Sequence, residues 1–355
     1  MSLKDFKDRF LEGLLTFLWR QWSAMGVMGT AGIEDEWVLD PEALVPLTFE
    51  AARYEPRLFD EVVGWMSANG ELLDATRLRA IILRQDTAAI RTTGAVLLYL
   101  ASIGHERKWG RLAQVCRNKI VHDRLPTEET LFRDKEGKPF PRTPAGGLES
   151  AFQAFRLYRP RIRLRENTGP LTVNAGTHLR FLLRSLFGPG GRSECLAYLL
   201  THDGGTPSQM AASSGLTLLS VMTTLKDMSR SGLVLTRKEG KRISYWVSQK
   251  RWWEFLSLAG GPAGERPKWL NWISVSSSLL GSLRALESLG ESEESEYIKT
   301  SRLHDHILVL SSELAGAGLD IPPVPSRGIP PEMYQRAATD FMGAVFGMGR
   351  EKVAA

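Results

Sequence analysis

The sequence contains few cysteines and no long hydrophobic run. Its 355 residues include only two cysteines, Cys116 and Cys195, too few for a disulfide scaffold or a four-thiolate zinc site. The most apolar uncharged stretch, Thr92–Gly104, is shorter than the ~20 residues that span a bilayer. Charged residues crowd the first twelve positions, which argues against a signal peptide. We therefore expect a cytoplasmic protein with reduced thiols and no membrane partner.

Motifs typical of enzymes and metal sites are also missing. The chain has no Gly-x-Ser-x-Gly elbow and no His-Glu-x-x-His zinc motif. His304 and His306 are two residues apart in a predicted helix, where their imidazoles would point to nearly opposite sides. We expect no catalytic residue, no metal and no cofactor. An enzyme whose site no motif reveals, in residues 1–130, is the remaining alternative.

The composition is that of a soluble globular protein, with 43% hydrophobic and 24% charged residues. The length suggests two or three domains, and the apolar spacing predicts a mainly α fold. Pro- and Gly-rich segments at Asp134–Gly147 and Gly260–Pro267 mark boundaries. We predict four parts: an N-terminal helical domain (1–133); a linker, Arg-rich arm and connecting helix over Val173–Phe187 (134–187); a central domain (188–256); and a C-terminal helical region for dimerisation or partner docking (257–355).

Positive charge is concentrated in the middle of the chain. The net charge is +5, but residues 151–256 hold sixteen Arg and Lys against six Asp and Glu, so the flanks are net acidic. A basic centre between acidic flanks is typical of a polyanion-binding domain. The alternative is a set of solvated arginine faces.

An extended arm opens this basic region. Residues 159–166 alternate Arg with Pro, Ile and Leu, which favours an extended segment over a helix. Its side chains could contact phosphates or protect an edge strand from aggregation. The residues concerned are Arg159, Arg161, Arg163 and Arg165.

The central domain shows a distinctive order of elements. A short helix at Ser193–Thr201 precedes a second one capped by Thr206 with Pro207 in its first turn. A turn at Ser214–Leu216 leads to a longer helix, Thr217–Arg230, with Val221, Leu225 and Met228 on one side. Two alternating segments follow, Leu233–Lys238 and Arg242–Val247, and they predict a hairpin.

The string Thr206–Ser248 resembles the winged helix-turn-helix family, especially the MarR-like and ArsR-like bacterial transcription regulators. The resemblance rests on Ala211 in the first helix of the motif, Gly215-Leu216 in the turn, and Val221 and Leu225 in the next helix. It implies a multi-domain helical protein with a central winged helix-turn-helix of three helices and a two-stranded wing. It also implies a homodimeric regulator of transcription that binds double-stranded DNA.

By this resemblance, the helix at 217–230 would enter the major groove and the wing at 237–242 would contact phosphates or the minor groove. Leu218 and Met222 could contact thymine methyl groups or a protein. The second option would make the domain a protein–protein interaction module within a larger assembly. The sequence does not identify any small-molecule or protein effector. The candidate DNA-binding residues are Ser208, Gln209, Thr217, Leu218, Ser220, Thr223, Thr224, Lys226, Arg237, Lys238, Lys241 and Arg242.

Overall fold

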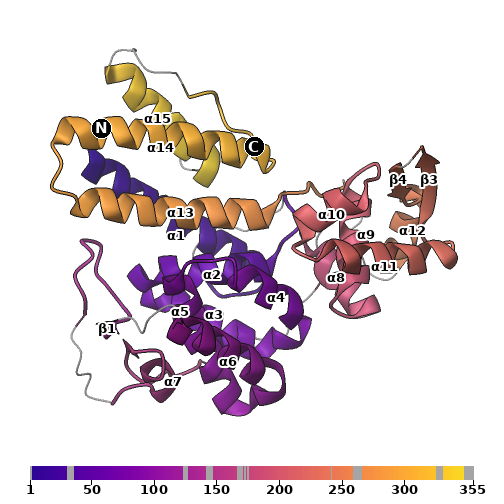
Figure 1. The fold of residues 1–355 in the computed structure, drawn as a ribbon, viewed down its shortest axis with the longest axis horizontal. Helices are drawn as coiled ribbons and strands as arrows, with labels where there is room; N and C mark the ends of the chain where they lie inside the picture. The colour runs from indigo at the N-terminus through magenta and orange to yellow at the C-terminus, as the bar shows by residue number, and fades with distance from the viewer. Residues whose placement is uncertain are drawn as a thin grey trace.

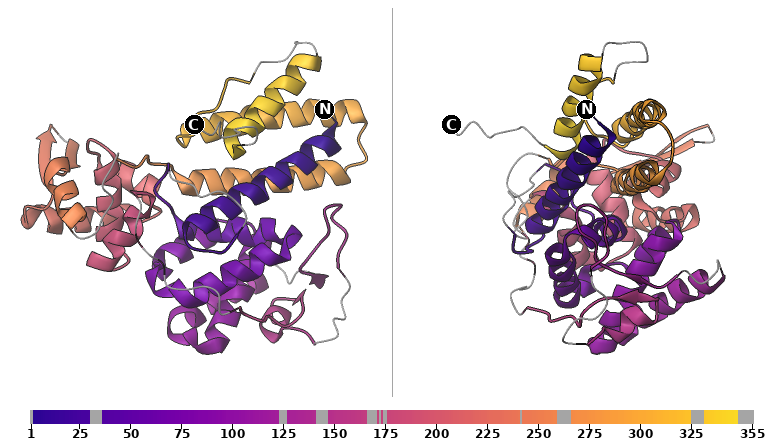
Figure 2. Two further views of the ribbon diagram at one scale, coloured as in Figure 1. Left: turned by 180° about the vertical axis from the view of Figure 1, so that it is seen from behind. Right: turned by 90° about the vertical axis from the view of Figure 1, so that its left-hand side faces the viewer.

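The computed structural model describes residues 2–29, 36–122, 127–140, 147–165, 171, 173, 176–240, 242–258, 266–324 and 331–347. The chain is mostly helical, as the sequence predicts (Figure 1). Two hydrophobic cores divide the described residues into a larger body and a smaller lobe formed by residues 179–258. The lobe projects from one end of the body in the front view and in the view from behind (Figure 2).

The N-terminal part of the body is a bundle of helices, several of which begin at a side-chain cap. Ser2 and Asp5 form a capping box at the start of the first helix. Asp40 caps the second by accepting from the Ala43 N–H at 3.2 Å, and Pro41 occupies its first position. The helices are α1 (Leu3–Ala24), α2 (Pro41–Ala51), α3 (Pro56–Asn69), α4 (Ala75–Ile82), α5 (Thr87–Leu100) and α6 (Glu106–His122).

A π-helical turn, Ala101–His105, connects α5 to α6, and Gly104 adopts a φ of +117° there. Length and composition alone would allow the continuous stretch Thr87–His122 to cross a membrane. Of its most apolar window, 61% is buried inside the protein. The mostly buried core helices of soluble proteins also meet this criterion of length and composition.

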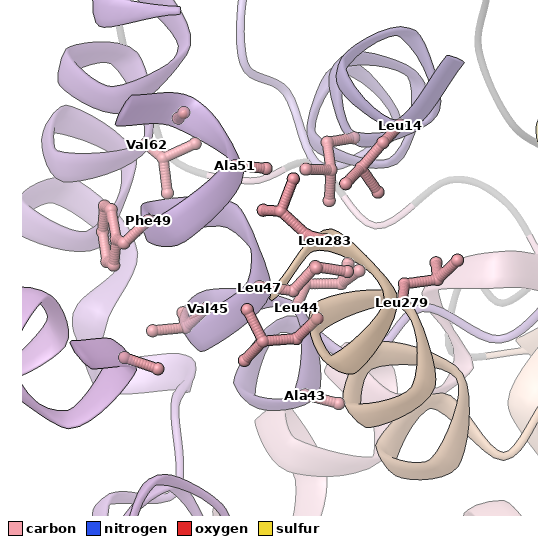
Figure 3. Close-up of a cluster of buried hydrophobic side chains, with 14 of the residues drawn as sticks. Leu14, Ala43, Leu44, Val45, Leu47, Phe49, Ala51, Val62, Leu279 and Leu283 are labelled. Atoms are coloured by element: carbon pink, nitrogen blue, oxygen red, sulfur yellow. The ribbon is translucent and has the colours of Figure 1, made fainter. Parts of the chain in front are cut away.

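The C-terminal helices pack on the N-terminal ones. These helices are α13 (Trp272–Glu291), α14 (Glu296–Gly316) and α15 (Pro331–Phe346). Leu279 and Leu283 of α13 lie against Leu44 and Leu47 of α2 (Figure 3). The rings of Phe10 and Phe346 are 5.3 Å apart in an edge-to-face contact. The described helices of residues 1–133 and 257–355, which the sequence suggests as separate regions, therefore share one core.

The described residues of the connection between body and lobe are mostly non-helical. Within it, β1 (Glu129–Thr130) pairs in parallel with β2 (Leu157–Tyr158), and α7 (Ser150–Gln153) is a single turn. The connecting helix predicted over residues 173–187 starts later, at Leu179, because a 3₁₀ turn at Gly176–His178 precedes it. His178 fixes that turn through a 2.7 Å hydrogen bond between its Nε2 and the Ala24 carbonyl.

The lobe contains five helices and one antiparallel hairpin around its own core. Its helices are α8 (Leu179–Phe187), α9 (Gly191–Thr201), α10 (Pro207–Ser214), α11 (Leu218–Arg230) and α12 (Gln249–Leu258), and its strands are β3 (Leu235–Glu239) and β4 (Arg242–Trp246). Leu196, Met210, Val221 and Leu225 are fully buried between the helices. The hairpin lies at the end of the lobe farthest from the body (Figure 1).

Candidate nucleic-acid interface

Local capping chemistry shapes the α10–turn–α11 unit. Thr206 and Gln209 form a capping box at the start of α10, in which the Gln209 Oε1 accepts from the Thr206 N–H at 2.9 Å. Gly215 ends α10 with a left-handed φ of +74°. Thr217 then caps α11 by accepting from the Ser220 N–H at 3.2 Å. A Cβ at position 215 would lie 2.6 Å from the Ile273 Cδ1, so the body approaches the turn closely at this glycine.

One side of α11 is exposed to solvent. Val221, Leu225 and Met228 face the core, whereas the exposed fractions of Leu218, Leu219 and Met222 are 46%, 74% and 49%. The candidate residues Ser208, Gln209, Thr217, Ser220, Thr223 and Lys226 are also exposed. The α10–α11 unit therefore presents an accessible helix with an apolar and hydroxyl-bearing surface.

Thr224 departs from the predicted exposed set. It is only half-exposed, and its Oγ1 would lie 2.6 Å from a Cβ built at Gly191. Its side chain thus faces α9 and cannot serve as an outward contact. The hydroxyl of Thr217 and the Oε1 of Gln209 are exposed but already accept hydrogen bonds in helix caps. Their roles are at least partly structural.

The hairpin distributes its cations over two faces. Arg237 lies opposite Ser244, Lys238 opposite Ile243, and Glu239 opposite Arg242. Because side chains alternate along a strand, Arg237 and Arg242 share one face and Lys238 lies on the other. All three residues are exposed, and Lys241 lies outside the described residues.

Backbone pairing attaches the hairpin to the start of α10. The N–H of Gly205 donates to the Tyr245 carbonyl, and the N–H of Tyr245 donates back to the Gly205 carbonyl, both at 2.9 Å. The neighbouring Gly204 has a φ of +135°, and a Cβ there would lie 2.9 Å from the Tyr245 carbonyl oxygen. Only glycine fits this approach, so the pair Gly204-Gly205 fixes the hairpin relative to α10.

An open groove lies between the hairpin and α10. Arg237 and Arg242 line it on one side, and Thr206 and Gln209 line it on the other. Asp203, Ser244 and Trp246 also line the groove, and sequence reasoning did not identify them. Ser244 and Trp246 lie on the same face of the hairpin as the two arginines because of the strand register. The sequence could show this only once the position of the turn is known.

A cluster of six buried charges joins the lobe to the body. Glu194 of α9 accepts from the Arg180 Nε at 3.0 Å and from the Arg184 Nη2 at 2.7 Å. Arg77 of α4 pairs with Asp40 at 2.5 Å and with Glu42 at 2.9 Å. Three guanidinium groups thus balance three carboxylates, and all six side chains are almost completely buried.

The electrostatics of this cluster keep its carboxyls ionised. Burial alone would raise the pKa of Glu194, but Arg180, Arg77 and Arg184 outweigh it and lower the pKa to about 2. Burial likewise opposes ionisation of Asp40, yet Arg180 and Arg77 hold its pKa well below the usual range. The Arg77 Nε also donates to the Ser214 carbonyl at the end of α10. The cluster therefore fixes the helix pair of the lobe to the body.

These contacts revise the sequence-based view of the basic central region. Arg180 and Arg184 are internal and neutralised, so they add nothing to a surface potential. Arg159 of the predicted arm is also buried: it pairs with Asp60 at 2.8 Å, and its guanidinium lies 5.1 Å from the centre of the Phe132 ring. Arg159 is therefore a structural residue and not a phosphate contact.

The rest of the arm follows the body instead of extending freely. Arg161, Arg163 and Arg165 are exposed, and Arg165 lies 3.4 Å from Glu61 of α3. Residues 159–165 are not helical, as the alternating pattern predicts, and Pro160 forms an isolated bridge with Leu148. Glu166 lies outside the described residues. Only the three exposed arginines remain available to a polyanion.

Neither cysteine is placed for reactivity or metal binding. Cys116 and Cys195 are both buried, and burial raises the pKa of each thiol to about 12. Among the residues that the structure describes, no three His, Cys, Asp or Glu side chains gather as a metal site would require.

Comparison with known proteins adds no further assignment. No protein-family model, curated protein or solved structure matches this chain. The accessible α11, the hairpin beside it and the chemistry of their side chains are the features of the molecule that point to a function.

Proposed function

We propose that the protein is a DNA-binding regulator of transcription and that its lobe is a winged helix-turn-helix. In this proposal α11 enters the major groove and the β3–β4 hairpin is the wing. The observation that carries it is the joint exposure of α11 and of the cationic hairpin on a lobe that projects from the body (Figure 1).

The physical chemistry of the two elements supports a division of labour. A major groove admits one α-helix, and the hydroxyls of Ser220 and Thr223 can donate to or accept from base edges. The apolar Leu218 and Met222 suit thymine methyl groups. No Arg or Lys precedes Lys226 in α11, so most of the electrostatic affinity would come from Arg237, Lys238 and Arg242 of the hairpin.

Binding to labelled duplexes of genomic DNA, measured by fluorescence anisotropy at several salt concentrations, tests the proposal. The slope of log K against log salt becomes shallower by about 0.9 for each phosphate contact that is lost. The double variant Arg237→Ala/Arg242→Ala should therefore bind more weakly, with a slope reduced by up to ~2. Wild-type affinity and slope in this variant would exclude the hairpin from the interface.

A matched control separates hairpin contacts from a general loss of charge. Lys250→Ala/Arg251→Ala removes two exposed cations from α12 within the same lobe. These residues lie outside the proposed interface, so their removal should leave the salt slope unchanged. An equal loss of slope in both variants would indicate non-specific attraction and not a wing.

One observation favours a second candidate function, a protein–protein interaction module. Leu218, Leu219 and Met222 form a contiguous exposed apolar surface on α11, and such surfaces often dock on partner proteins. If the wild-type protein binds no duplex even at low salt, this candidate replaces the first. Leu219→Glu should then abolish association with the partner without unfolding the lobe.

A further inference from the structure

Helix α6 of the body presents a second cationic surface, far from the hairpin in the fold (Figure 1). Its buried side carries Trp109, Leu112, Cys116 and Ile120. The opposite side is exposed and repeats at helical spacing. We call this surface the α6 face, and it consists of Arg107, Gly110, Arg111, Gln114, Arg117 and Asn118.

The arginines of the α6 face lie on the exposed side of the helix. In the part of the chain that the structure describes, no carboxylate pairs with Arg107, Arg111 or Arg117. The only acidic residue of α6 is Glu106, in its first turn, where the helix dipole favours a negative charge. By contrast, Lys108 on the flank pairs with Glu71 at 3.7 Å. Three guanidinium groups on one side of α6 are thus left to solvent or to a ligand.

The spacing of these groups suits a linear polyanion. At ~1.5 Å per residue, Arg107 and Arg111 are about 6 Å apart along the axis, and Arg117 lies about 15 Å from Arg107. One DNA strand places a phosphate every ~3.4 Å of helix axis, so the three arginines span roughly four phosphates.

The uncharged residues between the arginines add to this fit. Gln114 and Asn118 are joined by a 2.8 Å hydrogen bond from the Gln114 Nε2 to the Asn118 Oδ1. Their remaining amide hydrogens can donate to phosphate oxygens. Gly110 leaves the middle of the face open, since a Cβ there would meet only the Glu106 Cγ, at 3.4 Å.

We propose that the α6 face binds the phosphate backbone of duplex DNA as a second contact, separate from the hairpin. This inference rests on the proposed DNA-binding function and extends the footprint from the lobe to the body. The N-terminal flank is net acidic in the sequence, but apart from Glu106 its carboxylates do not belong to α6. The buried charge cluster links the lobe that carries the hairpin to the body that carries the α6 face.

The test compares three variants with the wild type on a ~30-bp duplex between about 50 and 200 mM salt. The first is Arg107→Ala/Arg111→Ala/Arg117→Ala, and the second is the hairpin variant Arg237→Ala/Arg242→Ala. The third, Lys4→Ala/Arg9→Ala/Lys138→Ala, removes three exposed cations from α1 and the segment after β1. Circular dichroism checks that each variant keeps its helical content.

We expect the α6 variant to reduce the salt slope by about 2 to 3 and the third variant to leave it unchanged. A wild-type slope in the α6 variant, with a weakened hairpin variant, would overturn this inference and leave the proposed function standing. A loss confined to the α6 variant would support the α6 face and refute the hairpin as a wing. A wild-type protein that binds no duplex at all would refute both.

Discussion

Replacing Glu194 by Gln should destabilise the protein strongly while keeping the shape of the side chain. The Glu194 carboxylate accepts hydrogen bonds from Arg180 and Arg184 and lies 3.7 Å from the Arg77 Nε. The substitution leaves three buried guanidinium groups facing two carboxylates. One uncompensated positive charge then remains in the interior, beyond the reach of water.

The magnitude follows from the burial of every partner. Breaking a buried ion pair by removing one member costs about 3 to 5 kcal/mol. A typical protein is stable by only ~5 to 15 kcal/mol, so this loss takes a large share of the total. Because the cluster joins lobe and body, we expect the lobe to unfold at lower urea concentration in the Glu194→Gln variant.

Urea unfolding, followed by far-ultraviolet circular dichroism, measures this effect. The control is Glu254→Gln, because Glu254 is exposed and its pair with Lys250 spans 4.0 Å at the surface. Removing such a surface pair should change stability by less than ~1 kcal/mol. If Glu194→Gln is as stable as this control, the reasoning about the buried cluster is wrong.

Three further predictions concern stability. First, the free energy of unfolding should fall as the pH drops from about 5 towards 2. Folding lowers the pKa of Glu194 and Asp40, so their contribution to stability is complete above the unfolded pKa and is lost as they protonate. In a denaturant series across this range, the free energy of unfolding of Glu194→Gln should depend less steeply on pH than that of the wild type. Second, Gly204→Ala should lower the free energy of unfolding by about 1 to 3 kcal/mol, because Gly204 has a φ of +135° and its Cβ would meet the Tyr245 carbonyl. Gly281→Ala in α13, where a Cβ would meet open space, should be neutral or stabilising. Equal thermal midpoints for the two variants would contradict the pairing of the hairpin with α10. Third, Leu225→Ala should lower the free energy of unfolding by about 2 to 5 kcal/mol and Leu219→Ala by less than ~0.5 kcal/mol, because only Leu225 is buried. The reverse order of stabilities in urea unfolding would mean that α11 is oriented differently.

Local signals in the sequence predicted the helices of the lobe. Thr206-Pro207 is a helix start whose side-chain cap the structure contains. The period-2 pattern beyond Gly232 predicted the hairpin, and its strands are β3 and β4. These features depend on residues a few positions apart, so they can be recognised without knowing the tertiary structure.

Long-range pairing could not be predicted in the same way. Arg184 donates to Glu42, which lies 142 residues earlier in the chain, and Arg159 pairs with Asp60 of α3. An arginine that is buried against a distant carboxylate has the same sequence signature as an exposed one. The count of basic residues in the central region therefore overstated its surface charge.

The face on which a strand residue lies also needed the structure. The sequence placed Arg237, Lys238 and Arg242 around one hairpin tip, but the register divides them between two faces. Likewise, the half-burial of Thr224 follows from the close approach of Gly191 in α9, which helix periodicity alone does not show.

The central claim is that α11 and the hairpin contact one duplex together, and site-specific photo-cross-linking tests it most directly. A photoreactive amino acid would replace Thr223 of α11, Thr236 of the hairpin, or Val309 of α14 as the control, all of them exposed. We predict cross-links to DNA from Thr223 and Thr236 and only background from Val309. A yield at Thr223 no higher than at Val309 would contradict the claim.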